Sequence, residues 1–275
     1  MKKQLNSDKS FLTARHIHMI GIGGSGMCPI AELLLSRGYK VTGSDRNDNA
    51  NVKRLRELGV TVYTEHIGDN IQGADLVAYS AAVPESNPEM VAAGENNIPK
   101  MERSELLGAI TRCYDNVIGV SGTHGKTTVS SMITQILLIN KQNPNAVIGG
   151  KLPMANSSCV VGESETLVCE SCEFVDSFLQ FSPDITVLLN IDDDHMDYFK
   201  TMDNLILSFH KFISMAKTVY LNGDDSLCVK AAEDIDADII TFGIDKSNDY
   251  HAENISAGNF GMRFIVFKGN IRLGE

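Results

Sequence analysis

The sequence has no tryptophan, only seven prolines, and no apolar run approaching the roughly 20 residues that a membrane-spanning helix needs. It begins with two adjacent lysines, but neither an apolar core nor a cleavage-like site follows them, so we expect no secretory signal. A basic tract is also missing, and the formal net charge is −11. These absences argue against membrane insertion and against nucleic acid as the main partner.

The six cysteines offer no pattern of a disulfide framework or of a zinc site. Five of them lie in or beside apolar segments, as reduced and buried cysteines do. Cys169 and Cys172 form a single CxxC, and no second pair completes a set of four zinc ligands. We therefore expect a reduced protein of the cytoplasm, and a redox or metal role for this CxxC is the less favoured interpretation.

The remaining pattern is an alternation of strands and helices, typical of an α/β protein with parallel sheets. The sequence predicts two domains. The first, over residues 1–113, is a Rossmann-like nucleotide-binding domain with a parallel sheet. The second, over 114–275, is a P-loop α/β domain that ends in an antiparallel strand pair. Expected strands include 17–21, 40–44, 60–63, 76–79, 117–120, 166–170 and 185–189, and expected helices include 25–37, 49–58, 88–96, 103–112, 126–139 and 203–216.

The most informative segment is VIGVSGTHGKTTVSSMITQILL, residues 117–138. An apolar strand leads into a loop with two glycines, and the loop ends Gly125-Lys126-Thr127-Thr128 before an amphipathic helix. Backbone N–H groups at such a helix N-terminus bind phosphate oxygens, Lys126 supplies a positive charge, and Thr127 offers a hydroxyl to Mg²⁺. The usual P-loop pattern has glycine at position 120, where this chain has Val120, so the match is a variant. The alternative is a tight turn that happens to contain a lysine.

A second glycine-rich loop, Gly21-Ile22-Gly23-Gly24-Ser25-Gly26, also follows a strand, and Asp45 lies nineteen positions after its last glycine. The pattern predicts a nucleotide diphosphate on the loop and Asp45 on a ribose hydroxyl. It does not distinguish NAD or FAD from another nucleotide diphosphate. A turn that serves only helix–sheet packing is a further alternative.

Polar side chains follow two further strands of the second domain. Glu170 ends an apolar strand, and the run Asn190 to Asp197, which contains His195, follows another. Because parallel strands bring their carboxyl ends to one sheet edge, these groups are candidate Mg²⁺ ligands near the phosphate loop. A solvated Glu170 and a structural His195 are the simpler alternatives. His124, within the loop, either contacts a transferred phosphoryl group or faces solvent.

Taken together, HIHMIGIGGSGM, YSAAVPESNPE, GTHGKTT, VCESCEFVDSF and LLNIDDDHMDYF resemble, in this order, the blocks of the Mur ligases, over about residues 14–275. These are ATP-dependent amide-forming enzymes of bacterial cell-wall precursor synthesis. The resemblance favours the members that join L-alanine to the carboxylate of UDP-N-acetylmuramate through an acyl phosphate. It implies a cytoplasmic protein with ATP and Mg²⁺, and a first glycine loop that holds UDP instead of a nicotinamide.

The resemblance also implies roles for individual residues. The catalytic candidates are Lys126, His124, Glu170 and His195, and the metal ligands are Thr127, Glu170 and His195. The ATP-binding segment comprises Gly122, Thr123, His124, Gly125, Lys126, Thr127 and Thr128. The UDP-sugar pocket comprises Gly23, Ser25, Gly26, Met27, Asp45 and Ser80.

The chain departs from the family pattern in two respects. Cys172 stands where many relatives carry Asp, and no counterpart of the third, amino-acid-binding domain is present. We therefore expect a shortened form that binds the UDP-sugar, and ATP weakly, without turnover. The alternatives that stay open are a peptide-recycling or folylpolyglutamate-type ligase of the same superfamily, an NAD-dependent oxidoreductase, and a non-enzymatic nucleotide-binding module.

Overall fold

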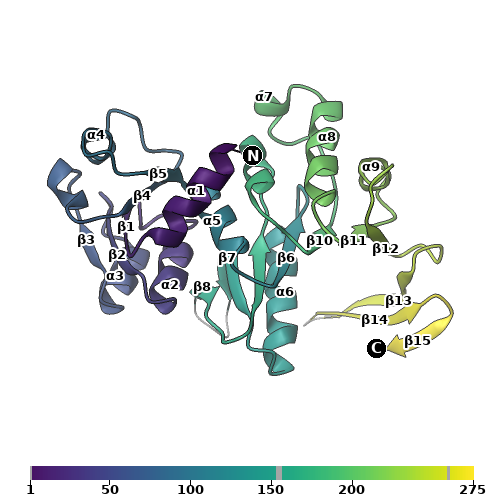
Figure 1. Ribbon diagram of the computed structural model, residues 1–275. Helices are drawn as coiled ribbons and strands as arrows, with labels where there is room; N and C mark the ends of the chain where they lie inside the picture. The colour runs from purple at the N-terminus through teal and green to yellow at the C-terminus, as the bar shows by residue number, and fades with distance from the viewer. Residues whose placement is uncertain (1, 153–156, 259–260) are drawn as a thin grey trace. The chain divides into compact units, whose positions relative to one another are not determined.

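The computed structural model describes residues 2–152, 157–258 and 261–275 (Figure 1). The chain forms two compact units that interleave along the sequence. The first unit contains residues 1–115 and 130–170, and the second contains 116–129 and 171–275. The predicted domain boundary at 113/114 stays a prediction beside this division.

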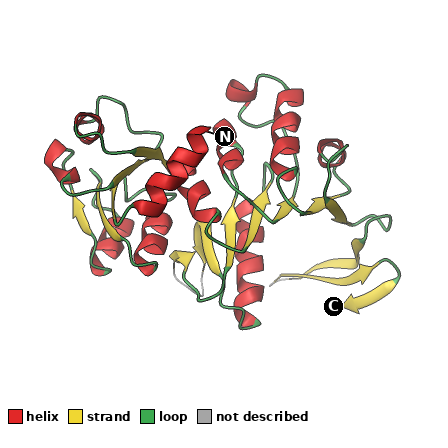
Figure 2. Cartoon of the chain, viewed as in Figure 1, coloured by secondary structure: helices red, strands yellow, loops and turns green. Residues whose placement is uncertain are grey.

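The first unit is built around a five-stranded sheet with the order β3-β2-β1-β4-β5, in which every pairing is parallel. Figure 2 draws the strands of the chain in yellow and its helices in red. Its strands are β1 (His16–Ile20), β2 (Lys40–Ser44), β3 (Thr61–Tyr63), β4 (Leu76–Tyr79) and β5 (Lys100–Glu102). Its helices are α1 (Lys2–Thr13), α2 (Cys28–Ser36), α3 (Ala50–Glu57), η1 (Gly68–Ile71), α4 (Pro88–Glu95) and α5 (Arg103–Thr111).

Local chemistry explains where these helices begin. The side chain of Asn49 accepts the N–H of Val52 at the start of α3, and Asn87 does the same for Glu89 in α4. In α5, Glu102 and Glu105 form a capping box. The central strand β1 is buried at all five positions, as strands covered on both faces are.

The first unit also contains strands β7 (Asn145–Leu152), β8 (Ser157–Val160) and β9 (Thr166–Glu170), and residues 130–139 of helix α6 (Lys126–Ile139). Strand β7 pairs parallel with β9 and antiparallel with β8.

In the second unit, β6 (Asn116–Ser121), β10 (Ile185–Leu188), β11 (Thr218–Asn222), β12 (Asp238–Gly243) and β13 (Tyr250–Gly258) follow one another in parallel. Strands β14 (Gly261–Lys268) and β15 (Ile271–Gly274) continue the sheet in antiparallel fashion. The helices of this unit are η2 (Phe174–Gln180), α7 (Met196–Phe199), α8 (Met202–Ile213) and α9 (Ser226–Ala231). Because Ser121 pairs with Leu188, the loops after β6 and β10 leave the same sheet edge.

The predicted α/β class, with a parallel sheet followed by a mostly parallel sheet that ends in antiparallel strands, is confirmed. Three details differ. The helix expected from Ser25 begins at Cys28, since residues 21–27 form successive turns. Helix α1 and the short strands β5 and β8 were not predicted, and the terminal antiparallel part has three strands. Within the described residues, none of the helices combines the length and apolar character needed to cross a membrane.

Candidate functional site

The loop after β6 lies tightly against the segment that leaves β10. Gly122 and Gly125 have φ values of 138° and 85°, which disfavour side chains. A Cβ atom on Gly122 would lie 3.0 Å from the Cβ of Leu189 and 3.1 Å from the backbone nitrogen of Asn190. Glycine at position 122 is therefore needed both for the backbone conformation and for the close approach.

Hydrogen bonds hold this loop in place. The N–H of His124 donates to Oδ1 of Asn190 at 2.7 Å, and Nδ2 of Asn190 donates to the His124 carbonyl at 3.0 Å. The N–H of Asp192 donates to the Thr123 hydroxyl at 2.9 Å. Helix α6 then begins at Lys126, so its first N–H groups lie at the end of an immobilised loop, as an anion site requires.

Lys126 is directed back toward the loop and a buried carboxylate. Its Nζ donates to the carbonyls of Gly122 at 2.5 Å and Thr123 at 3.0 Å, and to Oε2 of Glu173 at 2.9 Å. The side chains of Lys126 and Glu173 are 12% and 1% exposed. The ammonium group of Lys126 is thus held at the loop by Glu173, and a bound polyphosphate would compete with Glu173 for it.

Glu173 also belongs to a group of possible metal ligands with Asp194 and His195. One ligand atom from each lies within 4.8 Å of the others. His195 has a left-handed backbone (φ 54°) just before α7, and its ring packs against Phe174 with a centroid distance of 4.7 Å. Two carboxylates and an imidazole are a donor set that suits a divalent cation.

The turn after Glu173 is strained. Val175 and Asp176 have φ values of 53° and 56°, a conformation that costs most for a β-branched residue. Asp176 is bound by the hydroxyls of Tyr198, at 2.8 Å, and of Ser208. Contacts from α7 and α8 therefore impose the conformation that follows Glu173.

Glu173 was not among the residues predicted from the sequence, whereas Glu170 was, and the role of Glu170 stays a prediction. Glu170 belongs to the first unit, where its Oε2 accepts the N–H of Gly149 at 2.7 Å. The available signal was the second glutamate in CESCEF, three residues beyond the strand end. Of the predicted residues in the second unit, 122–128 form one continuous loop and helix start, and His195 lies in the candidate metal group. His124 is exposed, with Nε2 3.8 Å from Oδ2 of Asp192.

In the first unit, the loop after β1 is fixed by Asp45 at the end of β2. Oδ2 of Asp45 accepts the N–H of Gly23 at 2.9 Å, and Oδ1 accepts the N–H of Asn47 at 2.9 Å. A Cβ atom on Gly23 would lie 2.6 Å from Val52 and 2.9 Å from that carboxylate. Asp45 therefore orders the glycine loop from within the protein.

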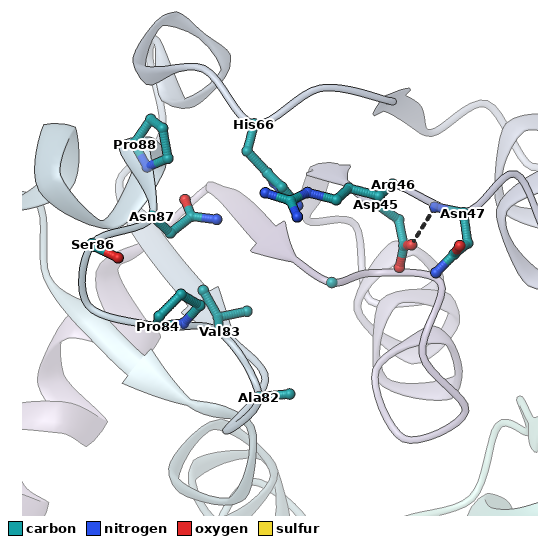
Figure 3. A pocket seen from close by; sticks show the side chains of 11 residues that line it. Asp45, Arg46, Asn47, His66, Ala82, Val83, Pro84, Ser86, Asn87 and Pro88 are labelled. Carbon is teal, nitrogen blue, oxygen red and sulfur yellow. Dashed lines mark hydrogen bonds between the residues drawn. The ribbon is translucent and has the colours of Figure 1, made fainter.

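A cavity of about 320 Å³ opens at the carboxyl end of this sheet (Figure 3). Its lining residues are Gly21, Asp45, Arg46, Asn47, His66, Ala82, Val83, Pro84, Ser86, Asn87 and Pro88. Asp45 is the predicted pocket residue in this lining. The other five, Gly23, Ser25, Gly26, Met27 and Ser80, lie in the segments that follow β1 and β4. Three further lining residues, Arg46, His66 and Asn87, were not predicted from the sequence, although Asn87 lies in the block YSAAVPESNPE.

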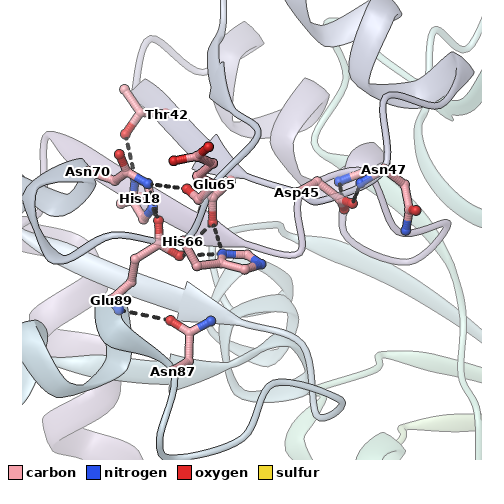
Figure 4. A network of polar contacts seen from close by, with 11 residues as sticks. His18, Thr42, Asp45, Asn47, Glu65, His66, Asn70, Asn87 and Glu89 are labelled. Atoms are coloured by element: carbon pink, nitrogen blue, oxygen red, sulfur yellow. Dashed lines mark hydrogen bonds and ion pairs between the residues drawn. The ribbon is translucent and has the colours of Figure 1, made fainter.

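Behind the cavity lies a fully buried carboxylate, Glu89 of α4 (Figure 4). Four side chains contact its oxygens at 2.6–3.3 Å: His18, Ser44, His66 and Asn70. Burial by itself would raise the pKa of Glu89, but these hydrogen bonds outweigh burial and lower the pKa from 4.5 to about 2. Glu89 is therefore a carboxylate at neutral pH.

Family models match most of the chain. A model described as the Mur ligase family, catalytic domain, matches residues 16–114, and one described as the Mur ligase middle domain matches residues 120–273. The chain is 42% identical over 261 residues to the UDP-N-acetylmuramate--L-alanine ligase of Clostridium acetobutylicum. That alignment covers 94% of this chain and 57% of the relative, so the chain spans little more than half the length of the curated relatives it matches.

Two solved structures have the same fold. One is the UDP-N-acetylmuramate-alanine ligase of Thermotoga maritima, with 28% identity and a TM-score of 0.83, over 94% of this chain and 59% of that one. The other is a murein peptide ligase of Psychrobacter arcticus, with 25% identity and a TM-score of 0.80, again over 94% and 59%.

Proposed function

Because this chain belongs to the Mur ligase family, we propose that it supplies the nucleotide-sugar-binding and ATP-binding parts of a ligase that joins L-alanine to UDP-N-acetylmuramate. The observation that carries the proposal is the juxtaposition of Lys126 with the group Glu173, Asp194 and His195 in the second unit. A phosphate-binding loop beside clustered carboxylates fits phosphoryl transfer from ATP better than hydride transfer.

ATP binds, in this proposal, at residues 122–128. The N–H groups at the start of α6 and the ammonium group of Lys126 contact the β- and γ-phosphates, and the hydroxyls of Thr127 and Thr128 lie at the same helix end. His124 is exposed beside this site and contacts the transferred phosphoryl group or the acceptor carboxylate.

Magnesium fits the donor set beside this loop. Bound there, Mg²⁺ neutralises charge on the triphosphate as the acceptor carboxylate approaches. Glu173 and His195 are the residues we expect to hold it, with the Thr127 hydroxyl as a further ligand. The role of Glu170 as a metal ligand stays a prediction, and its bond to Gly149 makes Glu173 the stronger candidate.

The UDP-sugar binds, in this proposal, at the cavity beside the first glycine loop. Arg46 brings a positive charge to the cavity wall, which suits a diphosphate, and Asp45 and Asn47 bring polar groups. Gly23, Ser25, Gly26, Met27 and Ser80 remain predicted contacts.

The proposed reaction has two steps. A carboxylate oxygen of UDP-N-acetylmuramate attacks the γ-phosphorus of ATP, and ADP leaves with the electrons of the broken P–O bond. The alanine amine then attacks the acyl phosphate carbonyl, inorganic phosphate leaves, and the amine gives up a proton as the amide forms. Since the resemblance to the Mur ligases implies a cytoplasmic protein, we place the protein in the cytoplasm.

A ligand titration of this chain tests the proposal. We expect UDP-N-acetylmuramate and Mg·ATP each to raise the melting temperature, and NADH to leave it unchanged. A rise with NADH alone would favour the oxidoreductase.

A murein peptide ligase is the second candidate, because the Psychrobacter arcticus structure is similar to this chain over 94% of its length. Comparing L-alanine with a murein tripeptide as the acceptor amine, in a protein that extends to the relatives' full length, separates the two.

A further inference from the structure

A line of hydrogen bonds runs through the interior of the first unit from Gly73 to Glu89. Figure 4 shows its last part, from Thr42 through His18 to Glu89. The carbonyl of Gly73 lies 2.8 Å from Nδ1 of His16, whose Nε2 lies 2.9 Å from the Thr42 hydroxyl. The same hydroxyl lies 2.9 Å from Nδ1 of His18, whose Nε2 lies 3.3 Å from Oε1 of Glu89. All four side chains are buried, and those of His18 and Glu89 are 0% exposed.

The four hydrogen bonds of this line need one more proton than its neutral groups supply. A carbonyl at one end and a carboxylate at the other can only accept hydrogen bonds. The four contacts therefore need four protons, whereas the Thr42 hydroxyl and two neutral imidazoles provide three. Without the fourth proton, two lone pairs would face each other in a buried site, which is costly.

The position of the extra proton follows by elimination. Burial lowers the pKa of His16 below its ordinary value of 6.5, so His16 is neutral near pH 7. Glu89 is ionised, because its hydrogen bonds lower its pKa to about 2. His18 remains as the group that carries two ring protons, facing a carboxylate with which it forms a buried ion pair.

This ion pair determines which ring nitrogen His66 presents to the cavity. The Ser44 hydroxyl donates to Oε2 of Glu89 at 2.6 Å, so its proton is used there. Nδ1 of His66 lies 2.8 Å from the same oxygen and must also donate. Nε2 of His66 has no hydrogen-bond partner among the described residues, and the ring lines the cavity with 12% of the side chain exposed.

We propose that His18 and Glu89 are positioning residues that hold His66 as the neutral Nδ1–H tautomer, so that its Nε2 accepts a hydrogen bond from a ligand N–H or O–H group. Because His18 already neutralises Glu89, His66 has no need of a second ring proton. The hydroxyls and the imide of a nucleotide sugar are donors of this kind. The identity of the ligand rests on the proposed function, whereas the protonation pattern does not.

Nitrogen-15 NMR of the histidine rings tests the protonation pattern in the unmodified, ligand-free chain at pH 8. We expect two protonated ring nitrogens for His18, and one, Nδ1, for His66. The variants His18→Gln and His66→Gln assign the signals. A single ring proton on His18, or a proton on Nε2 of His66, overturns the proposal.

Glu89→Gln then tests the positioning role. We expect His18 to lose its second ring proton and the dissociation constant for UDP-N-acetylmuramate to rise about 5-fold, as for a lost hydrogen bond between neutral groups. An unchanged constant overturns the positioning role. Thr42→Val, which keeps the side-chain shape, is the second variant should Glu89→Gln fold poorly, and it too should remove the extra proton from His18.

The matched control is Glu32→Gln. Glu32 is another buried carboxylate of the same unit, 7% exposed, and its oxygens are bound by Arg54 at 2.6 and 2.9 Å. We expect this variant to leave the signals of His18 and His66 and the binding of UDP-N-acetylmuramate unchanged. If the unmodified chain binds no UDP-N-acetylmuramate, the proposed function fails, while the ring signals still decide the ion pair.

Discussion

The two glycine loops of this molecule each accompany a buried carboxylate, but the carboxylates have different partners. Glu89, in the first unit, is bound by side chains outside the loop, including His18 and Ser44. Glu173, in the second unit, is bound by Lys126 of the loop itself. The first carboxylate therefore stabilises a scaffold, whereas the second holds a charge that a ligand can take over. Two loops with similar strand–loop–helix patterns therefore differ in their electrostatics: the carboxylate of the first unit is bound by the scaffold, and that of the second unit is bound by the loop lysine.

Removing Lys126 should abolish the ion pair with Glu173 in the second unit. We expect Lys126→Met to weaken Mg·ATP binding about 100-fold, since charge-assisted hydrogen bonds to phosphate are lost. It should also lower the free energy of unfolding by about 3 kcal/mol, because Glu173 stays buried without its partner. Calorimetric titration and urea unfolding measure the two effects.

A double variant separates these two roles. Lys126→Met combined with Glu173→Gln removes both charges, so we expect most of the lost stability to return while ATP binding stays weak. If the double variant is as unstable as Lys126→Met alone, the ion pair is not the source of the stability.

Acid should destabilise the first unit by protonating Glu89. The folded pKa of Glu89 is depressed from 4.5 to about 2, so its contribution is complete above pH 4.5 and is lost as the pH falls toward 2. We expect a loss on the order of 3 kcal/mol over that window, measured by urea unfolding. His16 acts in the same direction below pH 6.5, because its lowered pKa means that the unfolded chain binds the proton first.

The variant Glu89→Gln isolates the carboxylate in this experiment. It should be less stable than the unmodified chain at pH 7, and the difference between the two should shrink as the pH falls from 4.5. A difference that is the same at pH 3 and pH 7 would show that the charge of Glu89 contributes nothing.

The phosphate loop could be predicted from the sequence because its signals are local. A strand at 117–120, glycines at 122 and 125, and a helix beginning at Lys126 all appear in the structure as expected. The position of Glu173 beside Lys126, by contrast, depends on contacts that are distant in the sequence. The turn after Glu173 is set by contacts of Asp176 with Tyr198 and Ser208, which no propensity at positions 173–176 indicates.

In the first unit, too, the sequence predicts the strands and helices better than it predicts the residues that line the cavity. Its parallel sheet followed from the alternation of strands and helices, whereas the cavity is lined by Arg46, His66 and Asn87 from three separate connections. The helix after the glycine loop was placed too early because Gly24 and Met27 close successive turns instead of starting a helix. Long-range packing decides these positions, and a single sequence does not record it.

The smallest predicted effects come from steric contact and not from charge. They test whether close packing against Val52 and Asp45 is what requires glycine in the first loop. In Gly23→Ala the new methyl group would lie 2.6 Å from Val52 and 2.9 Å from Asp45, so we expect a loss of about 1–3 kcal/mol on urea unfolding. Gly94→Ala in α4 is the matched control, because nothing lies within 4 Å of its Cβ position. A helical glycine without such a neighbour should gain about 0.5–1 kcal/mol from the same substitution. Opposite signs for the two variants would show that close contact requires Gly23, whereas a gain at both would mean that the loop can move away from Asp45.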